Sequence, residues 1–491
     1  MAWGGLITGL LTAEPRPLTF FEKQASYPWL IVGLVSIGAF IGQLDATIVQ
    51  LALPTLGKTF TATLEAVSWV SLAYLVAFAS FLPIFGRLCE IYGRKSLYVI
   101  GYVIFIVASL ACGFAPDLGW LIALRVLQGI GGSMLGANSI AILVAAIDEE
   151  RRGRALGYFA AAQAVGMCAG PAVGGLVLGL LGWSWVFWVS VPFGLAGAFL
   201  GWLILPQTRA LDTRKRFDWD GALLLGPAIV MAVLALNQVT ARGATSPFIL
   251  GLVTAAAVLV WLLIRRERNS SSPLVDLRLF ASGAFTRGII AVVLGYSLLY
   301  GMFFLMSFAL EHGYGDTPLA AGLRLSAIPI ALGLVAPWSG ALSNRLGDRL
   351  LSAAGMGLCL AALTVLAYAE ANPDLARPIS TAAFVIFGAG LGVFIAPNNH
   401  ATIQAAPANL SGEAGSMLNL MRALGTSLGV AAASSTLSWR LESVTGLHQT
   451  WIPFAGHRTL FAIESSLGVL ALMAVAAAGL SLAKAGVSRR R

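Results

Sequence analysis

Long apolar runs alternate with short polar loops along the whole chain. A helix needs about 20 apolar residues to cross the hydrocarbon core of a bilayer. Fourteen runs of this kind cover residues 28–52, 68–86, 96–115, 118–146, 154–181, 184–205, 220–239, 247–264, 285–310, 318–343, 350–369, 379–404, 412–438 and 459–483. Backbone N–H and C=O groups find no water in hydrocarbon, so each run is expected to be helical. The pattern predicts an all-α polytopic membrane protein with 14 transmembrane helices.

The composition excludes a soluble fold. Hydrophobic residues make up 58% of the chain and charged residues 11%, whereas soluble domains carry about 25% charged residues. The net charge of +9 does not indicate nucleic-acid binding, because the basic residues are spread over short loops between the apolar runs. The four cysteines show no CxxC or Cys/His spacing, which predicts free thiols and no metal site.

The distribution of basic residues predicts the orientation in the membrane. Loops on the side of the two termini hold 23 of the 31 lysines and arginines, and loops on the other side hold five. Basic loops tend to stay in the cytoplasm, so both termini are expected there. The richness in arginine and alanine indicates a GC-rich bacterial genome, so the expected location is a bacterial inner membrane.

A short internal repeat divides the chain into two similar parts. Residues 86–97 read GRLCEIYGRKSL and residues 340–351 read GALSNRLGDRLL, with glycine, leucine and glycine at matching positions. Many transporters consist of duplicated halves with a substrate site between them. The predicted domains are a six-helix bundle over 1–205, two inserted helices with cytoplasmic linkers over 206–284, and a second six-helix bundle over 285–491.

Six motifs follow one another in order. They are LDATIVQLALP at 44–54, GRLCEIYGRKSL at 86–97, RVLQGIGGS at 125–133, GMCAGPAVGG at 166–175, FDWDGALLL at 217–225 and PLVDLRLF at 273–280. Together they resemble the Major Facilitator Superfamily, in particular its fourteen-helix drug:proton antiporter branch. The resemblance implies a monomeric, proton-coupled multidrug efflux transporter that confers antibiotic resistance, exports lipophilic and often cationic small molecules, and needs no cofactor. Three positions depart from the family pattern, with Glu90 in place of aspartate, Ser184 of arginine and Ser190 of asparagine.

Three charged residues within apolar runs are candidates for proton coupling. Charges in hydrocarbon are costly and usually face a polar interior. Burial disfavours the ionised form of Asp45, which suits a carboxyl that binds and releases a proton; the alternative is a structural aspartate bonded to neighbouring helices. The resemblance implies that Arg125 takes part in coupling, and the alternative is a brace to backbone carbonyls. Glu464 is a candidate because it lies inside the last run.

The motif between the second and third runs has a predicted role in gating. The resemblance implies that Gly86, Glu90, Gly93, Arg94 and Lys95 form a charged gate with a tight turn; a solvated basic loop is the alternative.

The helix 5 antiporter motif places small residues on one helix face. Gly166, Gly170 and Gly174 recur every four residues, Pro171 allows a kink, and Gly175 follows. This predicts either a flexible, leak-tight seam between the halves or simple helix packing.

Aromatic residues in two runs could line a substrate pocket. They are Trp69, Tyr74 and Phe78 in the second run and Tyr296, Tyr300, Phe303 and Phe304 in the ninth. Aromatic faces could hold a lipophilic cation, although a packing stripe is the favoured interpretation. Arg324 and Arg422 are expected to snorkel or to brace helices.

No GxxxxGK[ST], HExxH or Ser-His-Asp pattern is present, so we expect neither ATP-driven transport nor an enzyme. The remaining alternatives are export of lipids or fatty acids on the same fold, and a membrane sensor or scaffold that transports nothing.

Overall fold

The structure is a computed structural model of the 491-residue chain, and it describes residues 14, 16–208, 218–270, 273–371, 373–445 and 457–483. Helices joined by short loops make up this part of the chain, and no strand occurs in it. The first half comprises α2 (Thr19–Glu22), α3 (Tyr27–Thr59), α4 (Leu64–Tyr92), α5 (Arg94–Cys112), α6 (Leu118–Ala146), η1 (Glu149–Arg151), α7 (Arg152–Leu180), α8 (Ser184–Trp188) and α9 (Val191–Ile204).

Two helices stand between the halves in sequence, α10 (Trp219–Arg242) and α11 (Pro247–Asn269). The second half comprises η2 (Leu277–Ala281), α12 (Gly283–Phe308), a π-helical turn η3 (Ala309–Gly313), α13 (Pro318–Leu325), α14 (Ala327–Leu346), α15 (Asp348–Ala371), α16 (Pro373–Gln404), η4 (Ala408–Leu410), α17 (Ser411–Thr445) and α18 (His457–Leu482).

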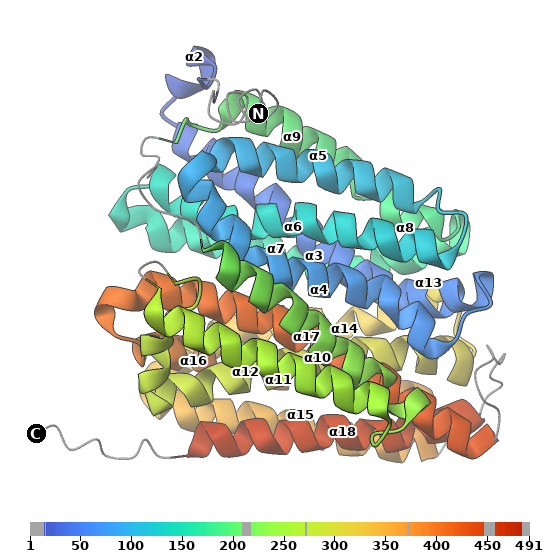
Figure 1. The fold of residues 1–491 in the computed structure, drawn as a ribbon. Coiled ribbons are helices and arrows are strands. Elements are labelled where there is room, and N and C mark those ends of the chain that lie inside the picture. The colour runs from blue at the N-terminus through green and yellow to red at the C-terminus, as the bar shows by residue number, and fades with distance from the viewer. Residues whose placement is uncertain are drawn as a thin grey trace, which may run out of the picture.

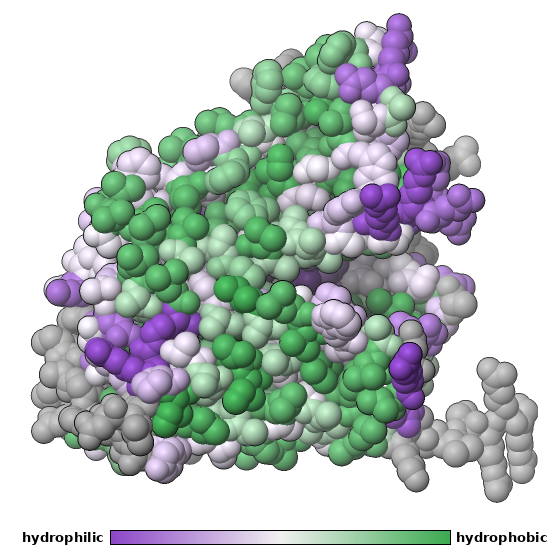
Figure 2. All heavy atoms as spheres, turned by 180° about the vertical axis from the view of Figure 1, so that it is seen from behind, coloured by the Kyte–Doolittle hydropathy of each residue, from purple (hydrophilic) through white to green (hydrophobic). Residues whose placement is uncertain are grey.

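The two halves form two layers of roughly parallel helices (Figure 1). The first half lies above the second in this view, and α10 packs against both α4 of the first and α17 of the second. We call the end of the bundle near the α4–α5 junction the termini end, because α2 and the last turn of α18 lie there, and the opposite end the far end. Apolar side chains cover most of the face between the two ends (Figure 2), and Trp338, Leu180 and Phe199 on the surface are 66–79% exposed. Such a surface suits a lipid environment.

The predicted membrane fold is confirmed. In the described part of the chain, 13 helical segments are long and apolar enough to cross a membrane. The predicted run at 412–438 is the remaining one and forms α17, whose 35 residues include Glu413 and Arg422. α17 packs against α4, α10, α12 and α18, so protein surrounds much of this helix, which is less apolar than the other thirteen and accounts for the fourteenth predicted run.

Several predicted helix boundaries are wrong. α4 runs over Leu64–Tyr92 rather than 68–86, because hydropathy marks the edge of the hydrocarbon while the helix continues into the polar region. The predicted span 318–343 is present as one apolar segment, and a turn at Ser326 divides it into α13 and α14. The predicted helix 184–205 is likewise divided into α8 and α9 just before Pro192.

Candidate functional site

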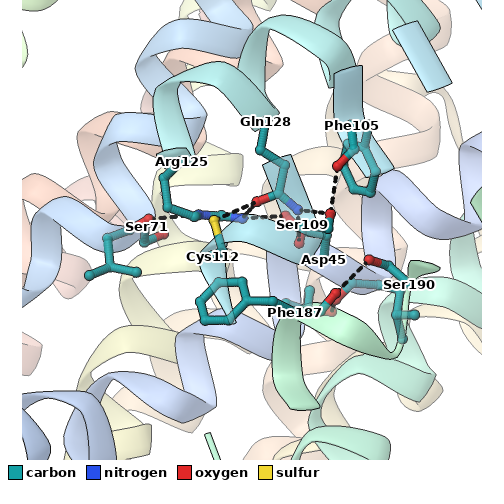
Figure 3. A network of polar contacts seen from close by, with 12 residues as sticks. Asp45, Ser71, Phe105, Ser109, Cys112, Arg125, Gln128, Phe187 and Ser190 are labelled. Atoms are coloured by element: carbon teal, nitrogen blue, oxygen red, sulfur yellow. Dashed lines mark hydrogen bonds and ion pairs between the residues drawn. The ribbon is translucent and has the colours of Figure 1, made fainter. Parts of the chain in front are cut away.

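A buried network of polar side chains joins α3 to α6. Arg125 Nη1 donates a hydrogen bond of 2.8 Å to Asp45 Oδ2, and Gln128 Nε2 donates one of 2.8 Å to Asp45 Oδ1. The side chains of Asp45 and Arg125 are each 1% exposed. The three side chains point toward one another in the interior of the first half (Figure 3). Both carboxylate oxygens therefore have a donor, which is what burial of a charge requires.

The arginine of this network has further partners. Arg125 Nε donates to the carbonyl oxygen of Val70 on α4 at 2.9 Å, and Nη1 also donates to Gln128 Oε1 at 2.5 Å. Gln128 Nε2 donates to Ser109 Oγ on α5 at 2.8 Å. Arg125 thus braces α6 to a backbone carbonyl of α4, as the alternative interpretation expected, and also pairs with Asp45; its role in proton coupling stays a prediction.

The sequence pattern explains how the network is positioned. Arg125 and Gln128 are three residues apart on α6 and so share one helix face. Close packing of α6 brings this face to its neighbours, because an added Cβ at Gly129 would lie 2.6 Å from the Tyr74 carbonyl oxygen and one at Gly131 would lie 2.7 Å from the Phe105 nitrogen. Sequence reasoning missed Gln128, although its spacing from Arg125 was visible.

The glycines of α7 pack mainly within the first half. An added Cβ at Gly166 would overlap with the Phe40 carbonyl, one at Gly170 would overlap with Thr47, and one at Gly174 would lie 2.8 Å from Ile48. These contacts press α7 against the stretch of α3 that carries Asp45. The interpretation of Gly166, Gly170 and Gly174 as a seam between the halves is therefore wrong, because the face that they share is turned toward α3.

The seam between the halves lies on the other side of α7. An added Cβ at Gly175 would overlap with the carbonyl of Pro318, and one at Gly322 with the carbonyl of Pro171. Gly175 and Pro171 therefore face α13 in the second half, and α7 remains one helix through Pro171. These two residues lie where the halves meet, and their role in a flexible, leak-tight seam stays a prediction.

Hydrogen bonds at the far end also join the halves. Asn237 Nδ2 of α10 donates to Ser68 Oγ of α4 at 3.0 Å and to Ser434 Oγ of α17 at 3.1 Å; we call these three residues the far-end clamp. Thr55 Oγ1 of α3 donates to Glu311 Oε2 of η3 at 3.4 Å. The halves are thus closed upon each other at the far end.

A cavity opens between the halves on the other side of this closure. Its lining comes from α3, α4, α5, α6 and α7 of the first half and from α12 and α17 of the second. Tyr74 is part of the lining, and Cζ of Arg125 lies 4.3 Å from the centre of its ring. The Asp45–Arg125 pair is therefore separated from the cavity by one aromatic side chain.

The predicted aromatic residues divide into two groups. Tyr74, Phe78, Tyr296 and Tyr300 line the cavity. Three others do not. Trp69 Nε1 donates to Asn237 Oδ1 at 2.9 Å, while Phe303 and Phe304 are buried in the hydrophobic core. Trp69, Phe303 and Phe304 do not belong to the predicted substrate pocket; they lie nearer the far end, where helix packing fills the space, as the favoured packing interpretation expected.

The predicted gate residues lie at the termini end. Gly93 has a φ of 105°, which favours glycine, and an added Cβ there would overlap with the Glu14 carboxylate. Glu90 accepts a hydrogen bond of 2.9 Å from Arg87, Lys95 Nζ donates to the Leu205 carbonyl at 2.8 Å, and the backbone N–H of Arg94 donates to Thr208 Oγ1 at 2.9 Å. The bonds of Lys95 and Arg94 tie the α4–α5 junction to the segment after α9, whereas the bond from Arg87 to Glu90 lies within α4. Gly86 is different, because it lies inside α4 and an added Cβ there would meet no atom within 4 Å, so Gly86 is not part of the tight turn.

Three other predicted residues have clear places. Glu464 lies on α18 of the second half, outside both the network and the cavity lining. Arg324 braces helices as expected, with an ion pair to Asp316 and a hydrogen bond of 3.1 Å to Thr381. Arg422 lines the cavity instead. Sequence reasoning missed it, because the pattern does not tell which way a mid-helix arginine faces. No group of three or more His, Cys, Asp or Glu side chains that could hold a metal occurs in the described ranges.

Relatives in sequence are transporters and drug resistance proteins. The riboflavin transporter RibZ of Clostridioides difficile is 31% identical over 438 residues, which cover 89% of this chain and 93% of the relative. The multidrug resistance protein Stp of Mycobacterium tuberculosis is 30% identical and covers 84% of this chain and 76% of its own length. The tetracenomycin C resistance and export protein of Streptomyces glaucescens is 30% identical, with coverage of 90% and 82%.

Solved structures share the fold. A bacterial homologue of the human lysosomal transporter Spinster, in an inward-facing and unoccupied conformation, superposes with a TM-score of 0.66 at 16% identity and covers 94% of this chain and 97% of its own. An auto-inhibited POT family peptide transporter gives a TM-score of 0.65 at 16% identity, with coverage of 95% and 98%. The sequence profile of the Major Facilitator Superfamily matches residues 35–430. The chain therefore belongs to the Major Facilitator Superfamily.

Proposed function

We propose that the protein is a proton-coupled exporter of small lipophilic molecules that works by alternating access. The observation that supports this proposal is the buried Asp45–Arg125 pair beside a cavity between two halves that are closed at the far end. The named functions of the relatives, transport of riboflavin and resistance to drugs, support transport of small molecules.

Proton binding at Asp45 would change the charge balance inside the first half. A proton on Asp45 removes the negative partner of Arg125, and an unpaired guanidinium in a low-dielectric interior is unfavourable. The protonated state therefore favours a rearrangement of α3 against α6, and Tyr74 is the lining residue that contacts Arg125. Such a rearrangement at the cavity wall gives a physical link between proton binding and the exposure of substrate.

The proton gradient supplies enough energy for export. A charge that crosses a membrane potential of 100 mV gains about 2.3 kcal/mol, which corresponds to about 50-fold accumulation for one proton per molecule. With the basic termini end in the cytoplasm, the cavity of this conformation opens inward. The protein then works as a monomer in the bacterial inner membrane and needs no cofactor.

The test is transport in proteoliposomes with an imposed pH gradient and a panel of fluorescent lipophilic compounds. Wild type should move compound and protons in opposite directions, and Asp45→Asn should abolish the gradient-driven part. Asp220→Asn, at a carboxylate whose side chain is 69% exposed, is the matched control and should transport normally. Glu464→Gln tests the other candidate carboxyl. Full transport by both Asp45→Asn and Arg125→Ala would overturn the proposal.

A second function on the same fold is export of lipids or fatty acids. The observation that favours it is Arg422 in the cavity lining, since a cationic side chain can pair with an anionic head group. Competition between decanoate and aromatic compounds in the same vesicles separates the two. A sensor or scaffold that transports nothing predicts no proton movement with any compound.

A further inference from the structure

In the part of the chain that the structure describes, the cavity lining carries positive charge and no negative charge. Among the described residues that line the cavity, Arg422 is the only one with a formal charge, and no aspartate or glutamate belongs to the lining. The nearby carboxylate, Asp45, is already bonded to Arg125 and Gln128. A cationic substrate would therefore enter a site that contains a cation and no free carboxylate.

Arg422 lies about a third of the way along α17, well away from both ends of the helix. It is the twelfth residue of α17, which places it about 17 Å from the start of the helix at 1.5 Å per residue. Its guanidinium carbon lies 5.8 Å from the centre of the Tyr296 ring. No hydrogen bond or ion pair joins it to any residue that the structure describes, in contrast to Arg125 and Arg324. A charge at this depth usually has a partner or a function.

The rest of the lining suits a flat aromatic body. Tyr74 and Phe78 stack with ring centres 6.2 Å apart on the first-half wall, and Tyr296 and Tyr300 lie on the second-half wall. Side-chain amides add donors and acceptors around them, from Gln43, Gln163 and Asn419. Aromatic walls with a few polar groups are typical of sites for planar ligands.

We propose that the cavity binds planar aromatic compounds with an anionic group, and that this group pairs with Arg422. The inference rests on the proposed function, because it names the substrate class of that transport site. It differs from the expectation of a cationic substrate, which the cavity lining does not favour. Charge-assisted hydrogen bonds from a guanidinium to a carboxylate are strong and directional, so Arg422 selects for the sign of the charge while the aromatic walls select for shape.

The test is equilibrium binding to the full-length protein in detergent, without a gradient, measured by ligand fluorescence. Three probes share one ring system and differ in charge: anthracene-9-carboxylate, 9-anthracenemethanol and 9-(aminomethyl)anthracene. Wild type should bind the carboxylate about tenfold or more tightly than the alcohol, and the amine should bind most weakly. Arg422→Gln should remove this preference and leave alcohol binding nearly unchanged, and Arg422→Lys should retain part of it.

Two controls exclude indirect effects. Arg154→Gln removes an exposed arginine that lies 5.5 Å from the Trp29 ring, away from the cavity lining, and should keep the preference for the carboxylate. Unchanged thermal unfolding of Arg422→Gln shows that the variant is folded; if it unfolds early, Arg422→Lys carries the comparison.

The outcomes separate this inference from the proposed function. Equal binding of the three probes to wild type, tighter binding of the amine, or an undiminished preference for the carboxylate in the folded Arg422 variants would overturn the inferred substrate class. Binding of decanoate more tightly than the aromatic acid would overturn the assignment of an aromatic body. A preference for the acid that depends on Arg422, together with no gradient-driven transport, would keep the substrate class and overturn proton-coupled export.

Discussion

Removal of either partner of the buried Asp45–Arg125 pair should lower the free energy of unfolding strongly. Removal of both partners should lower it by much less than the sum of the two single effects. Both side chains are 1% exposed, and truncation of one member of such a pair costs about 3–5 kcal/mol because the other charge remains buried. Arg125→Met leaves Asp45 with the amide of Gln128 as a donor. Asp45→Asn leaves the guanidinium with neutral acceptors at Val70 and Gln128.

The double variant contains neither charge. Its cost should therefore fall well below the sum of the single costs, which is about 6–10 kcal/mol. The assay is a double-mutant cycle on the free energy of unfolding in micelles at pH 7, with helicity as the signal. We expect a coupling energy between Asp45 and Arg125 of at least about 2 kcal/mol.

A partly exposed pair in the same protein provides the control. The side chains of Arg87 and Glu90 are 26% and 32% exposed, and pairs of this kind contribute about 0–1 kcal/mol. The cycle with Arg87→Met and Glu90→Gln should therefore give a small coupling. If the costs of the buried pair add within about 0.5 kcal/mol, the two charges do not stabilise each other and the reasoning is refuted.

Three further changes test other parts of the structure. Gly170→Val should prevent stable folding because its side chain would overlap α3, whereas Gly157→Val, with open space around it, should fold normally in size-exclusion profiles. Asn237→Leu removes the amide that joins α4 to α17, so labelling of cysteines introduced in the far-end seam should rise several-fold; unchanged labelling would contradict the far-end clamp. Hydrogen bonding to Arg278 lowers the pKa of Asp276, so its stabilising contribution is complete above about pH 4 and is lost as the pH falls below that value. Asp276→Asn should flatten the unfolding free energy across that acid range, and a wild-type slope would argue against it.

Much of the fold could be predicted because the bilayer restricts the chain to a few solutions. Hydropathy located the helices but not their ends, as α4 shows, because a helix continues beyond the hydrocarbon. Hydropathy also gave no sign that α13 and α14 are separate helices. α17 is less apolar than its neighbours because protein, rather than lipid, surrounds much of it.

The candidate site could be predicted only in part. Asp45 and Arg125 stood out because charges are rare in apolar runs, and the structure brings them into contact. Gln128 carries no charge and was therefore missed. Arg422 was expected to snorkel or brace, because the sequence does not show which helices of the other half face a residue. The position of a side chain across the interface between two halves is a property of tertiary packing, and no periodic pattern encodes it.

The bonds of Asn237 have a consequence for the two extra helices. Its amide nitrogen holds one hydroxyl on each half, so any outward opening must break at least one of these bonds. With the bond from Trp69, Asn237 has two hydrogen bonds to α4 and one to α17, so α10 and α11 would move with the first half if the bond to Ser434 is the one that breaks. An exporter with twelve helices lacks these two extra helices. Here the hydrogen bonds of one asparagine would determine with which half α10 and α11 move through the lipid.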